Sequence, residues 1–412
     1  MDCTTTLYAL GSNGSFQLGI GHEDDVSSPQ KCRFMVNDEN SSGSGIVEYI
    51  PLDVGEQITK IVAGGNHTLL LTTHGHVWAT GLNEDGQLGC TGQEVGTENT
   101  AAAGRGTWKR VQWHREGQSE AVKFTDVAAT WMASFFVVNG HSVFSCGRGN
   151  KGELGLGVDR CNASTLTPCF DLHEFEPGVP EGRIMKVSGC VNHVVGLSSS
   201  GELYGWGACR KGQLGVELKD EKVVWIPQRL IVDLKWKPKQ VATGREFTLV
   251  VGDTPAEQCF LGDAGRMGFE TPVLCDADSK HDFEVYAGWT HVVLRKGDGS
   301  LCGFGRSQRG QLLVRQSQRR IASFVMGSEH SLAVIDDGSV IAWGWGEHGN
   351  CGAEVDERKN VKARYNTIFA ASYGQRVAGV GAGCATSFFW IESRAPIGKE
   401  DAGSNLRRTL LP

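Results

Sequence analysis

Short apolar segments alternate with polar turns along most of this chain. In the clearest copy, residues 331–335 are mostly apolar, 336–339 contain Asp-Gly, and 340–343 form a second apolar segment. Two apolar runs joined by a turn centred on Asp-Gly are typical of a β-hairpin. The same pattern recurs at 67–81, 134–147, 193–207, 247–262 and 291–305. The chain is therefore predicted to consist of antiparallel β-hairpins.

Two further strings accompany the hairpins. One string follows each hairpin and consists of a glycine, four variable residues and a segment similar to Gly-Gln-Leu-Gly. Its clearest copies are GLNEDGQLG from Gly81, GRGNKGELG from Gly147 and GACRKGQLG from Gly207. More divergent copies begin at Gly11, Gly262, Gly305 and Gly344. A short loop-like string precedes each hairpin, and its seven copies lie near residues 66, 131, 191, 245, 289, 328 and 384. Repeats spaced by roughly forty to sixty residues are typical of β-propeller blades.

The two ends of the chain predict how the ring closes. Residues 5–10 form one strand with no hairpin partner before it, and residues 386–391 form another with no returning strand after it. Pairing these two strands would complete one blade and remove an open sheet edge. We therefore expect an all-β fold, a seven-bladed β-propeller over residues 1–392 closed by its N- and C-terminal strands. A disordered tail is expected at 393–412.

Composition excludes several classes of protein. The chain has 56 glycines but only 11 prolines in 412 residues, which favours many tight turns over a disordered linker. Its net charge of −7 gives no drive toward nucleic acid or anionic lipid. The first residues show no secretory signal and no stretch approaches 18 apolar residues, so we expect no membrane contact. The 13 cysteines include no CxxC pair and predict reduced thiols, hence a cytoplasmic protein, with a nuclear share left open.

Three segments stand outside the repeat. We expect a long surface loop at 90–108, a second polar insertion at 156–182 and a Ser/Gly-rich segment at 37–45. Residues 108–115 interleave basic and aromatic side chains, as nucleic-acid binders do. The same residues fall where a blade needs its outer strand, and we favour that interpretation over direct nucleic-acid binding.

The motifs that suggest catalysis are weak. Two GxGxxG strings begin at Gly147 and Gly344, but both lie inside the repeat and no helical pattern follows them. Four histidines share one repeat position, and residues in different blades lie too far apart to bind one ion, so we expect a structural role. They are His67, His193, His291 and His330. No catalytic residue, metal site or cofactor is assigned, and the protein is not expected to be an enzyme.

The loops that precede the hairpins would lie on one rim of the ring. Two of them contain tryptophan, Trp131 and Trp289, and Arg245 and Glu329 occupy the same rim. Trp and Arg beside acidic groups are typical of a protein-interaction hot spot. The alternative is that each Trp packs into its own blade, and the sequence favours neither.

The repeated strings resemble RCC1 repeats, and they cover residues 5–391. Within that family the chain is similar to a fungal α-tubulin-suppressor, killer-toxin-insensitivity subfamily. The similarity rests on GSNGSFQLGIGHEDDVSSPQ from Gly11, GGNHTLLLT from Gly64, GSEHSLAV from Gly327, WGWGEHGNCG from Trp343 and GAGCATSFFW from Gly381.

The resemblance implies a non-catalytic protein that forms a heterodimer with a small CSL-type zinc-finger protein. That partner carries electrons for diphthamide synthesis on elongation factor 2 and supports Elongator-dependent modification of wobble uridines in tRNA. Elongator itself would be reached through the partner. The family-specific string adds Trp345, Glu347 and His348 to the four rim residues as expected partner contacts.

Two other functions remain open. The founding RCC1 protein is a guanine-nucleotide exchange factor, so exchange on a Ran-like small GTPase is the main alternative. A substrate-recruiting module for a ubiquitin ligase acting in trans is the third. Direct tRNA binding fits the acidic net charge least well.

Overall fold

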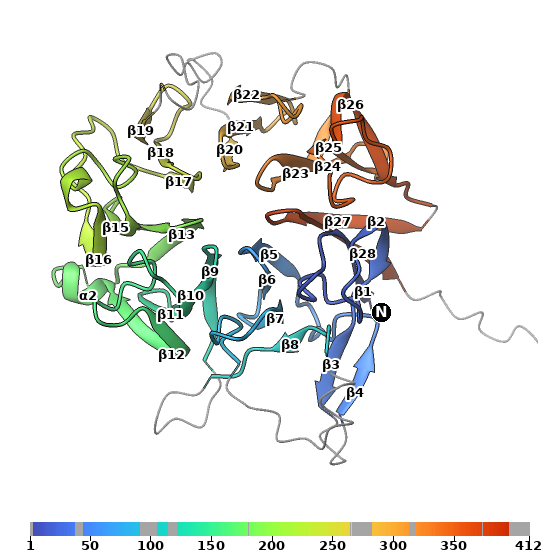
Figure 1. Cartoon of the computed structure of the whole chain (residues 1–412), viewed down its shortest axis with the longest axis horizontal. Coiled ribbons are helices and arrows are strands. Elements are labelled where there is room, and N and C mark those ends of the chain that lie inside the picture. The colour runs from blue at the N-terminus through green and yellow to red at the C-terminus, as the bar shows by residue number, and fades with distance from the viewer. Residues whose placement is uncertain are drawn as a thin grey trace, which may run out of the picture.

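The computed structural model describes residues 3–37, 44–90, 105–113, 122–179, 181–263, 265, 282–312, 319–372 and 374–394. These residues form a closed ring of seven antiparallel sheets, a β-propeller (Figure 1). Most of the loop expected at 90–108 and the residues after 394 lie outside the described part. The last strand runs to Arg394, past the boundary expected at 392.

Each blade is a small sheet whose first strand faces the axis. We number the blades around the ring, starting at the blade that holds both the first and the last described strand. Blade 1 contains β27 (Gln375–Ala382), β28 (Thr386–Arg394), β1 (Cys3–Gly11) and β2 (Val26–Lys31). Blade 2 contains β5 (Ile58–Ala63), β6 (His67–Thr72), β7 (Val77–Gly81) and β8 (Lys109–Arg110). Blade 3 contains β9 (Phe124–Ala129), β10 (Ala133–Val138), β11 (Ser142–Arg148) and β12 (Asn162–Asp171).

The remaining blades repeat the same order. Blade 4 contains β13 (Ile184–Cys190), β14 (His193–Ser198), β15 (Leu203–Ala208) and β16 (Val223–Arg229). Blade 5 contains β17 (Gln240–Thr243), β18 (Phe247–Val251) and β19 (Gln258–Gly262), and blade 6 contains β20 (Phe283–Ala287), β21 (His291–Lys296) and β22 (Leu301–Gly305). Blade 7 contains β23 (Ile321–Met326), β24 (His330–Ile335), β25 (Val340–Trp345) and β26 (Asn360–Phe369).

The ring closes as the sequence predicts. β1 pairs antiparallel with β28 over its whole length, from Cys3 opposite Arg394 to Gly11 opposite Thr386. Figure 1 shows the blue N-terminal strand beside the red C-terminal strand in one blade. Because the two ends share a sheet, the first and last blades leave no open edge between them.

Two expected insertions contain regular structure. The segment at 156–182 is not only an insertion, since it supplies the outer strand β12 and the short helix α2 (Leu172–Phe175). Its polar composition reflects an outer strand that is half exposed. In the Ser/Gly-rich segment at 37–45, residue 37 ends β3 (Phe34–Asn37) and residues 44–45 begin β4 (Ser44–Val47), and the two strands pair antiparallel. Residues 38–43 lie outside the described residues. A 3-10 turn, η1 (Lys219–Glu221), precedes β16.

The basic-aromatic segment is an outer strand in its described part. β8 pairs with β7, and Trp108 beside it is fully buried, where its indole donates a hydrogen bond of 3.3 Å to the Leu18 carbonyl. The strand interpretation is therefore confirmed for Lys109 and Arg110, with Trp108 in an isolated bridge to Phe34. Residues 111–113 are not in a strand, and 114–115 lie outside the described residues.

The first glycine of each repeat lies at the end of the third strand of its blade, as the last or the next-to-last residue, and has a positive φ. At Gly147 (φ 103°) an added Cβ would lie 2.3 Å from the Met132 carbonyl oxygen, and at Gly81 (φ 109°) it would lie 2.4 Å from that of Asn66. Only glycine tolerates both this backbone conformation and this approach to the preceding loop.

The Gly-Gln-Leu-Gly segments join adjacent blades. The Gln87 side chain accepts a hydrogen bond of 3.0 Å from the Asp85 amide, which folds the loop. The backbone carbonyl of Gln87 accepts a hydrogen bond of 2.6 Å from the Ser134 hydroxyl in the next blade. The backbone carbonyls of Gln17 and Gln213 likewise accept hydrogen bonds from the hydroxyls of Thr68 and Thr248. Leu88 and its counterparts Leu18, Leu154 and Leu214 are buried between sheets, and Leu312 is partly buried.

The four repeat histidines are buried structural groups. The Nε2 atom of His193 lies 3.1 Å from Thr248 Oγ1 in the next blade, and that of His330 lies 3.1 Å from Ser387 Oγ. Burial lowers the pKa of His67, His193 and His330 to about 4 and that of His291 to about 3. They are therefore neutral at physiological pH, and each occupies the boundary between two blades.

The cysteines depart from the expectation in one place. Ten described cysteines are free thiols. Cys302 is instead disulfide-bonded, so the thiols of this chain are not all reduced.

Candidate protein-interaction site

The loops between the first and second strands of the blades form a ring at one mouth of the central channel. We call them the rim loops, and the face they lie on the rim face. Backbone hydrogen bonds link them from blade to blade. The amide and carbonyl pairs are Gly65 with Trp131 (2.9 Å), Trp131 with Val191 (2.9 Å), Arg245 with Trp289 (3.0 Å), Trp289 with Ser328 (2.8 Å), and Ser328 with Gly383 (3.1 Å). This bonding links the rim loops of blades 2, 3 and 4 to one another, and those of blades 5, 6, 7 and 1 to one another.

The Gly-Gln-Leu-Gly segments lie on the same face. In each blade the second strand leads away from the rim and the antiparallel third strand returns to it, as β24 and β25 do in blade 7. Trp345, which ends the third strand of blade 7, and Glu347 and His348 after it therefore lie beside the rim loops. All seven residues expected to contact a partner share this face.

Trp131 and Trp289 meet although they come from blades 3 and 6. Their ring centroids lie 6.0 Å apart at an interplanar angle of 44°. Trp131 is 42% exposed and lies over Gly65, where an added Cβ would come within 2.9 Å of the indole. The two indoles therefore pack on each other at the channel mouth, and the alternative in which each Trp packs into its own blade does not hold.

Arg245 completes this aromatic cluster. Its guanidinium carbon lies 5.5 Å from the centre of the Trp289 ring, within the range of a cation–π contact. Because its backbone amide is also bonded to Trp289, the side chain is held beside the ring. We call Trp131, Trp289 and Arg245 the rim cluster.

Glu329 connects the rim cluster to a second group of side chains. One carboxylate oxygen accepts a hydrogen bond of 3.1 Å from Thr290, and the other accepts from Gln311. Burial raises the pKa of this carboxyl, while the bonds from Thr290 and Gln311 oppose the rise. The Glu329 carbonyl accepts from the Trp345 amide at 2.9 Å. Glu329 is therefore held mainly by its hydrogen bonds with Thr290, Gln311 and Trp345.

Trp345, Glu347 and His348 lie together in blade 7. The Trp345 indole donates to Glu347 at 3.0 Å, and its ring meets His348 edge to face at 5.4 Å. His348 Nδ1 lies 2.7 Å from the Asp25 carboxylate of blade 1, and the Arg309 guanidinium covers Trp345 at 5.0 Å. Sequence analysis missed Arg309 and Asp25. Arg309 occupies a variable position of a repeat, so its residue type alone does not predict the contact with Trp345.

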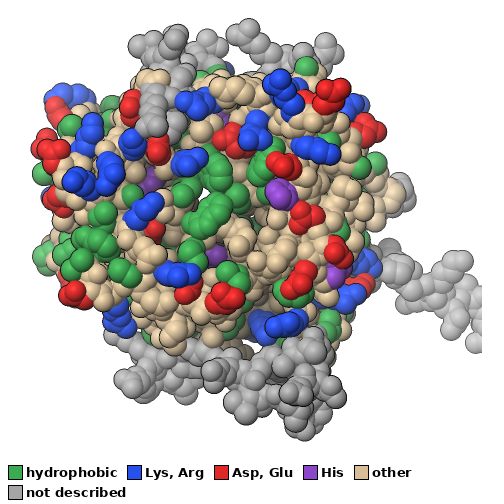
Figure 2. Space-filling model, in the orientation of Figure 1, with side chains coloured by type: hydrophobic (Ala, Val, Ile, Leu, Met, Phe, Trp, Pro, Cys, Tyr) green, Lys and Arg blue, Asp and Glu red, His purple; other side chains and the backbone are tan. Residues whose placement is uncertain are grey.

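Hydrophobic side chains gather at the centre of one face of the ring, and charged side chains surround them (Figure 2). An apolar centre inside a charged margin is the usual anatomy of a protein interface. The rim cluster supplies aromatic surface and a cation of the kind that dominates binding energy.

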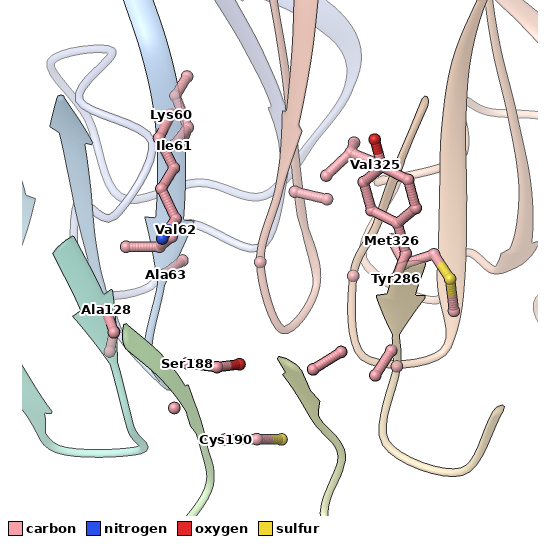
Figure 3. Close-up of a pocket in the computed structure, with 18 of the residues that line it drawn as sticks. Lys60, Ile61, Val62, Ala63, Ala128, Ser188, Cys190, Tyr286, Val325 and Met326 are labelled. Carbon is pink, nitrogen blue, oxygen red and sulfur yellow. The ribbon is translucent and has the colours of Figure 1, made fainter. Parts of the chain in front are cut away.

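A cavity of about 590 Å³ lies along the channel, lined by the first strands of the blades (Figure 3). Five charged or amide side chains occupy the same position in successive blades, seven residues before the second strand begins. They are Lys60, Asp126, Lys186, Gln240 and Glu284. The repeat therefore places a polar ring at one level of the inner strands.

Most members of this polar ring bond across blades. Asp126 accepts from Lys60 at 2.7 Å and from the Val187 amide at 2.8 Å, which joins blades 2, 3 and 4. Glu284 accepts from Tyr286 at 2.8 Å and pairs with Arg295 at 3.2 Å. The Lys186 ammonium makes no hydrogen bond or ion pair within the described residues, and burial followed by the charge of Lys60 lowers its pKa to about 8.

The two GxGxxG strings lie in loops of the repeat. Strands β12 and β26 follow them, where a dinucleotide site needs a helix. Among the described helices, none is long and apolar enough to cross a membrane.

The comparisons with known proteins agree with the propeller fold. Residues 6–389 match the model of the RCC1-like domain. The chain belongs to the RCC1-like domain family. An RCC1 repeat-containing protein of Schizosaccharomyces pombe is 31% identical over 399 residues, covering 94% of this chain and 99% of that protein. The secretion-regulating guanine nucleotide exchange factor of Bos taurus is 27% identical, covering 84% of this chain and 75% of that protein.

A solved structure shares the fold. The yeast RCC1 protein Prp20, solved bound to Kap60, superposes with a TM-score of 0.68 at 18% identity, covering 95% of this chain and 90% of that one. At this identity the likeness concerns the fold alone. The prediction of a seven-bladed RCC1-like propeller is confirmed.

Proposed function

We propose that this protein is a non-catalytic binding propeller that holds a partner protein on its rim face. The observation that carries the proposal is the rim cluster, in which two partly exposed indoles from opposite sides of the ring and a guanidinium form one contiguous surface. Rigid aromatic surface presented by hydrogen-bonded loops loses little conformational entropy on binding.

The proposed partner is a small CSL-type zinc-finger protein, bound as a heterodimer. The resemblance of the string around Trp345 to the fungal subfamily supports this choice. Through that partner the protein would support diphthamide synthesis and Elongator-dependent tRNA modification, in the cytoplasm and with a share in the nucleus. Trp131, Arg245, Trp289, Glu329, Trp345, Glu347 and His348 are the proposed contact residues, and no membrane or direct nucleic-acid contact is proposed.

We expect Trp289→Ala to weaken binding of this partner by roughly 30-fold, about 2 kcal/mol, because the rim cluster would lose one of its two indoles. Calorimetric titration of the purified zinc protein into each variant measures the change. Ile231→Ala is the matched control, since Ile231 is an apolar side chain that is 81% exposed after β16. Wild-type binding by Trp289→Ala would place the interface elsewhere, with Trp345→Ala as the next variant.

The second candidate function is guanine-nucleotide exchange on a small GTPase. It rests on the similarity to the bovine protein, whose name states that activity. Release of fluorescent GDP from a Ran-like GTPase, with and without this protein, distinguishes the two functions. Accelerated release together with no binding of the zinc protein at micromolar concentration would overturn the first proposal.

A further inference from the structure

Two histidines and an aspartate meet in blade 3, at the end of its strands opposite the rim loops. His141 lies in the turn between β10 and β11, Asp171 ends β12, and His173 lies in α2. The pairing of β11 with β12 places Ser142 directly opposite Asp171, and the Leu172 amide donates to the His141 carbonyl at 2.9 Å. The fold itself therefore brings the three side chains together.

Their donor atoms form a compact group. One imidazole nitrogen from each histidine and one carboxylate oxygen all lie within 4.8 Å of one another. His141 Nδ1 lies 3.4 Å from Asp171 Oδ2, and the two imidazoles stack with centroids 4.4 Å apart at 18°. In the described part of the chain no Lys or Arg pairs with Asp171, so its charge faces only the histidines.

The carboxylate is held in place by neighbouring donors. Ser142 Oγ donates to Asp171 Oδ2 at 2.6 Å, and the His173 amide donates to Oδ1 at 3.0 Å. Ser142 Oγ also lies 3.0 Å from His141 Nδ1. Partners that orient a ligand in this way are a regular feature of metal sites and contribute to their affinity.

We propose that His141, Asp171 and His173 form a zinc site that ties α2 and the β10–β11 turn to the end of β12. Two imidazole nitrogens and one carboxylate oxygen match the ligand preference of Zn²⁺ and not that of Ca²⁺ or Mg²⁺. Three protein ligands leave the fourth tetrahedral position to water.

Binding requires a small movement. In a tetrahedral zinc site with bonds of about 2.0–2.2 Å, the ligand atoms lie roughly 3.4 Å from one another. The donor atoms of this group lie within 4.8 Å of one another, so some of them must come closer. Asp171 and His141 already lie at that separation, so the His173 ring must turn out of its stack with His141. The side chains of His141 and Asp171 are 27% and 33% exposed, so an ion can reach them from solvent.

Nine described thiols are expected to compete poorly for the same ion. Zinc binds the thiolate form, and burial raises the pKa of most described cysteines. The raised groups are Cys32, Cys90, Cys146, Cys169, Cys190, Cys209, Cys259, Cys351 and Cys384.

The test is titration of the purified full chain with Zn²⁺ by calorimetry at neutral pH, with Co²⁺ absorption as a second readout. We expect one site of micromolar affinity, a tetrahedral Co²⁺ spectrum and a higher melting temperature with Zn²⁺. His173→Ala and Asp171→Asn should each weaken binding by at least ~10-fold, and Ser142→Ala by about 10-fold through the orientation of Asp171. Circular dichroism checks that each variant is folded.

His74→Ala is the control, because His74 belongs to the other described group of possible ligands, with Asp53 and Glu56. It should leave the affinity unchanged. Loss of binding in His74→Ala with retention in His173→Ala would overturn the proposal and move the ion to that group. An affinity weaker than millimolar in the wild type, or unchanged affinity in both His173→Ala and Asp171→Asn, would also overturn it.

Discussion

Replacement of Asp126 by alanine is expected to lower the free energy of unfolding by about 3 kcal/mol. Asp126 is 8% exposed, and its carboxylate accepts hydrogen bonds from Lys60 of blade 2, Val187 of blade 4 and its own neighbour Val127. Alanine would leave the half-buried Lys60 ammonium without its carboxylate and the Val187 amide without an acceptor. The unpaired ammonium and the unpaired amide would each destabilise the fold at the place where three blades meet.

Thermal and urea unfolding of the variant measure this loss. Asp233→Ala is the matched control, since Asp233 pairs with Lys235 at 3.4 Å but both side chains are 88% exposed. An exposed pair contributes at most about 1 kcal/mol, so the control should unfold close to the wild type. The double variant Lys60→Met/Asp126→Ala should recover part of the loss because it removes the unpaired ammonium. A single Asp126→Ala variant as stable as the control would contradict this account of the polar ring.

Acidification from pH 6.5 toward pH 4 is expected to destabilise the propeller steeply. His67, His193 and His330 have a pKa of about 4 and His291 one of about 3, against 6.5 for a free histidine. The cause is burial, and at His291 the nearby His330 adds to it. In this window the unfolded chain binds protons that the folded chain does not, so stability is full above pH 6.5 and falls as the pH drops.

The size of the effect follows from the proton count. Each histidine contributes up to about 1.4 kcal/mol per pH unit, so the four together give at most about 5.5 kcal/mol per unit. Glu153 and Glu329 act in the opposite sense, because burial raises their pKa values in the fold.

Melting temperatures between pH 8 and pH 5 measure the slope. His330→Gln should reduce the proton uptake on unfolding by about one proton at pH 5, while His348→Gln, at a partly exposed position, tests whether a surface histidine has the same effect. A melting temperature that does not change over this range would show that the buried histidines are not neutral.

Much of the architecture was predictable because each blade is specified locally. The Asp-Gly turn at 336–339 and the apolar runs beside it fix a hairpin without reference to the rest of the chain. The unpaired strands at the two ends predicted the pairing of β1 with β28. The outer strands were harder to predict. β12 is polar because one of its faces is exposed to solvent, and register shifts interrupt its pairing, so its sequence resembles an insertion more than a strand.

The candidate site was predicted only in part. Trp131, Arg245, Trp289 and Glu329 were placed on one rim from their repeat position, and the resemblance added Trp345, Glu347 and His348. The sequence carried no indication that the two indoles touch, since their blades are not neighbours in the ring. It also gave no indication of Arg309 over Trp345, or of the Asp25 contact between blades 7 and 1.

The sequence by itself determined the blade, the number of blades, the closure of the ring and the face on which the repeat motifs lie. These follow from turns and alternating strands, whose interactions are local in the chain. The tertiary structure alone decided which side chains meet across the axis or at a blade edge, such as Trp131 with Trp289 and His141 with Asp171 and His173. Such contacts depend on the curvature of the closed ring and on strand register, which bring together residues that no local pattern relates.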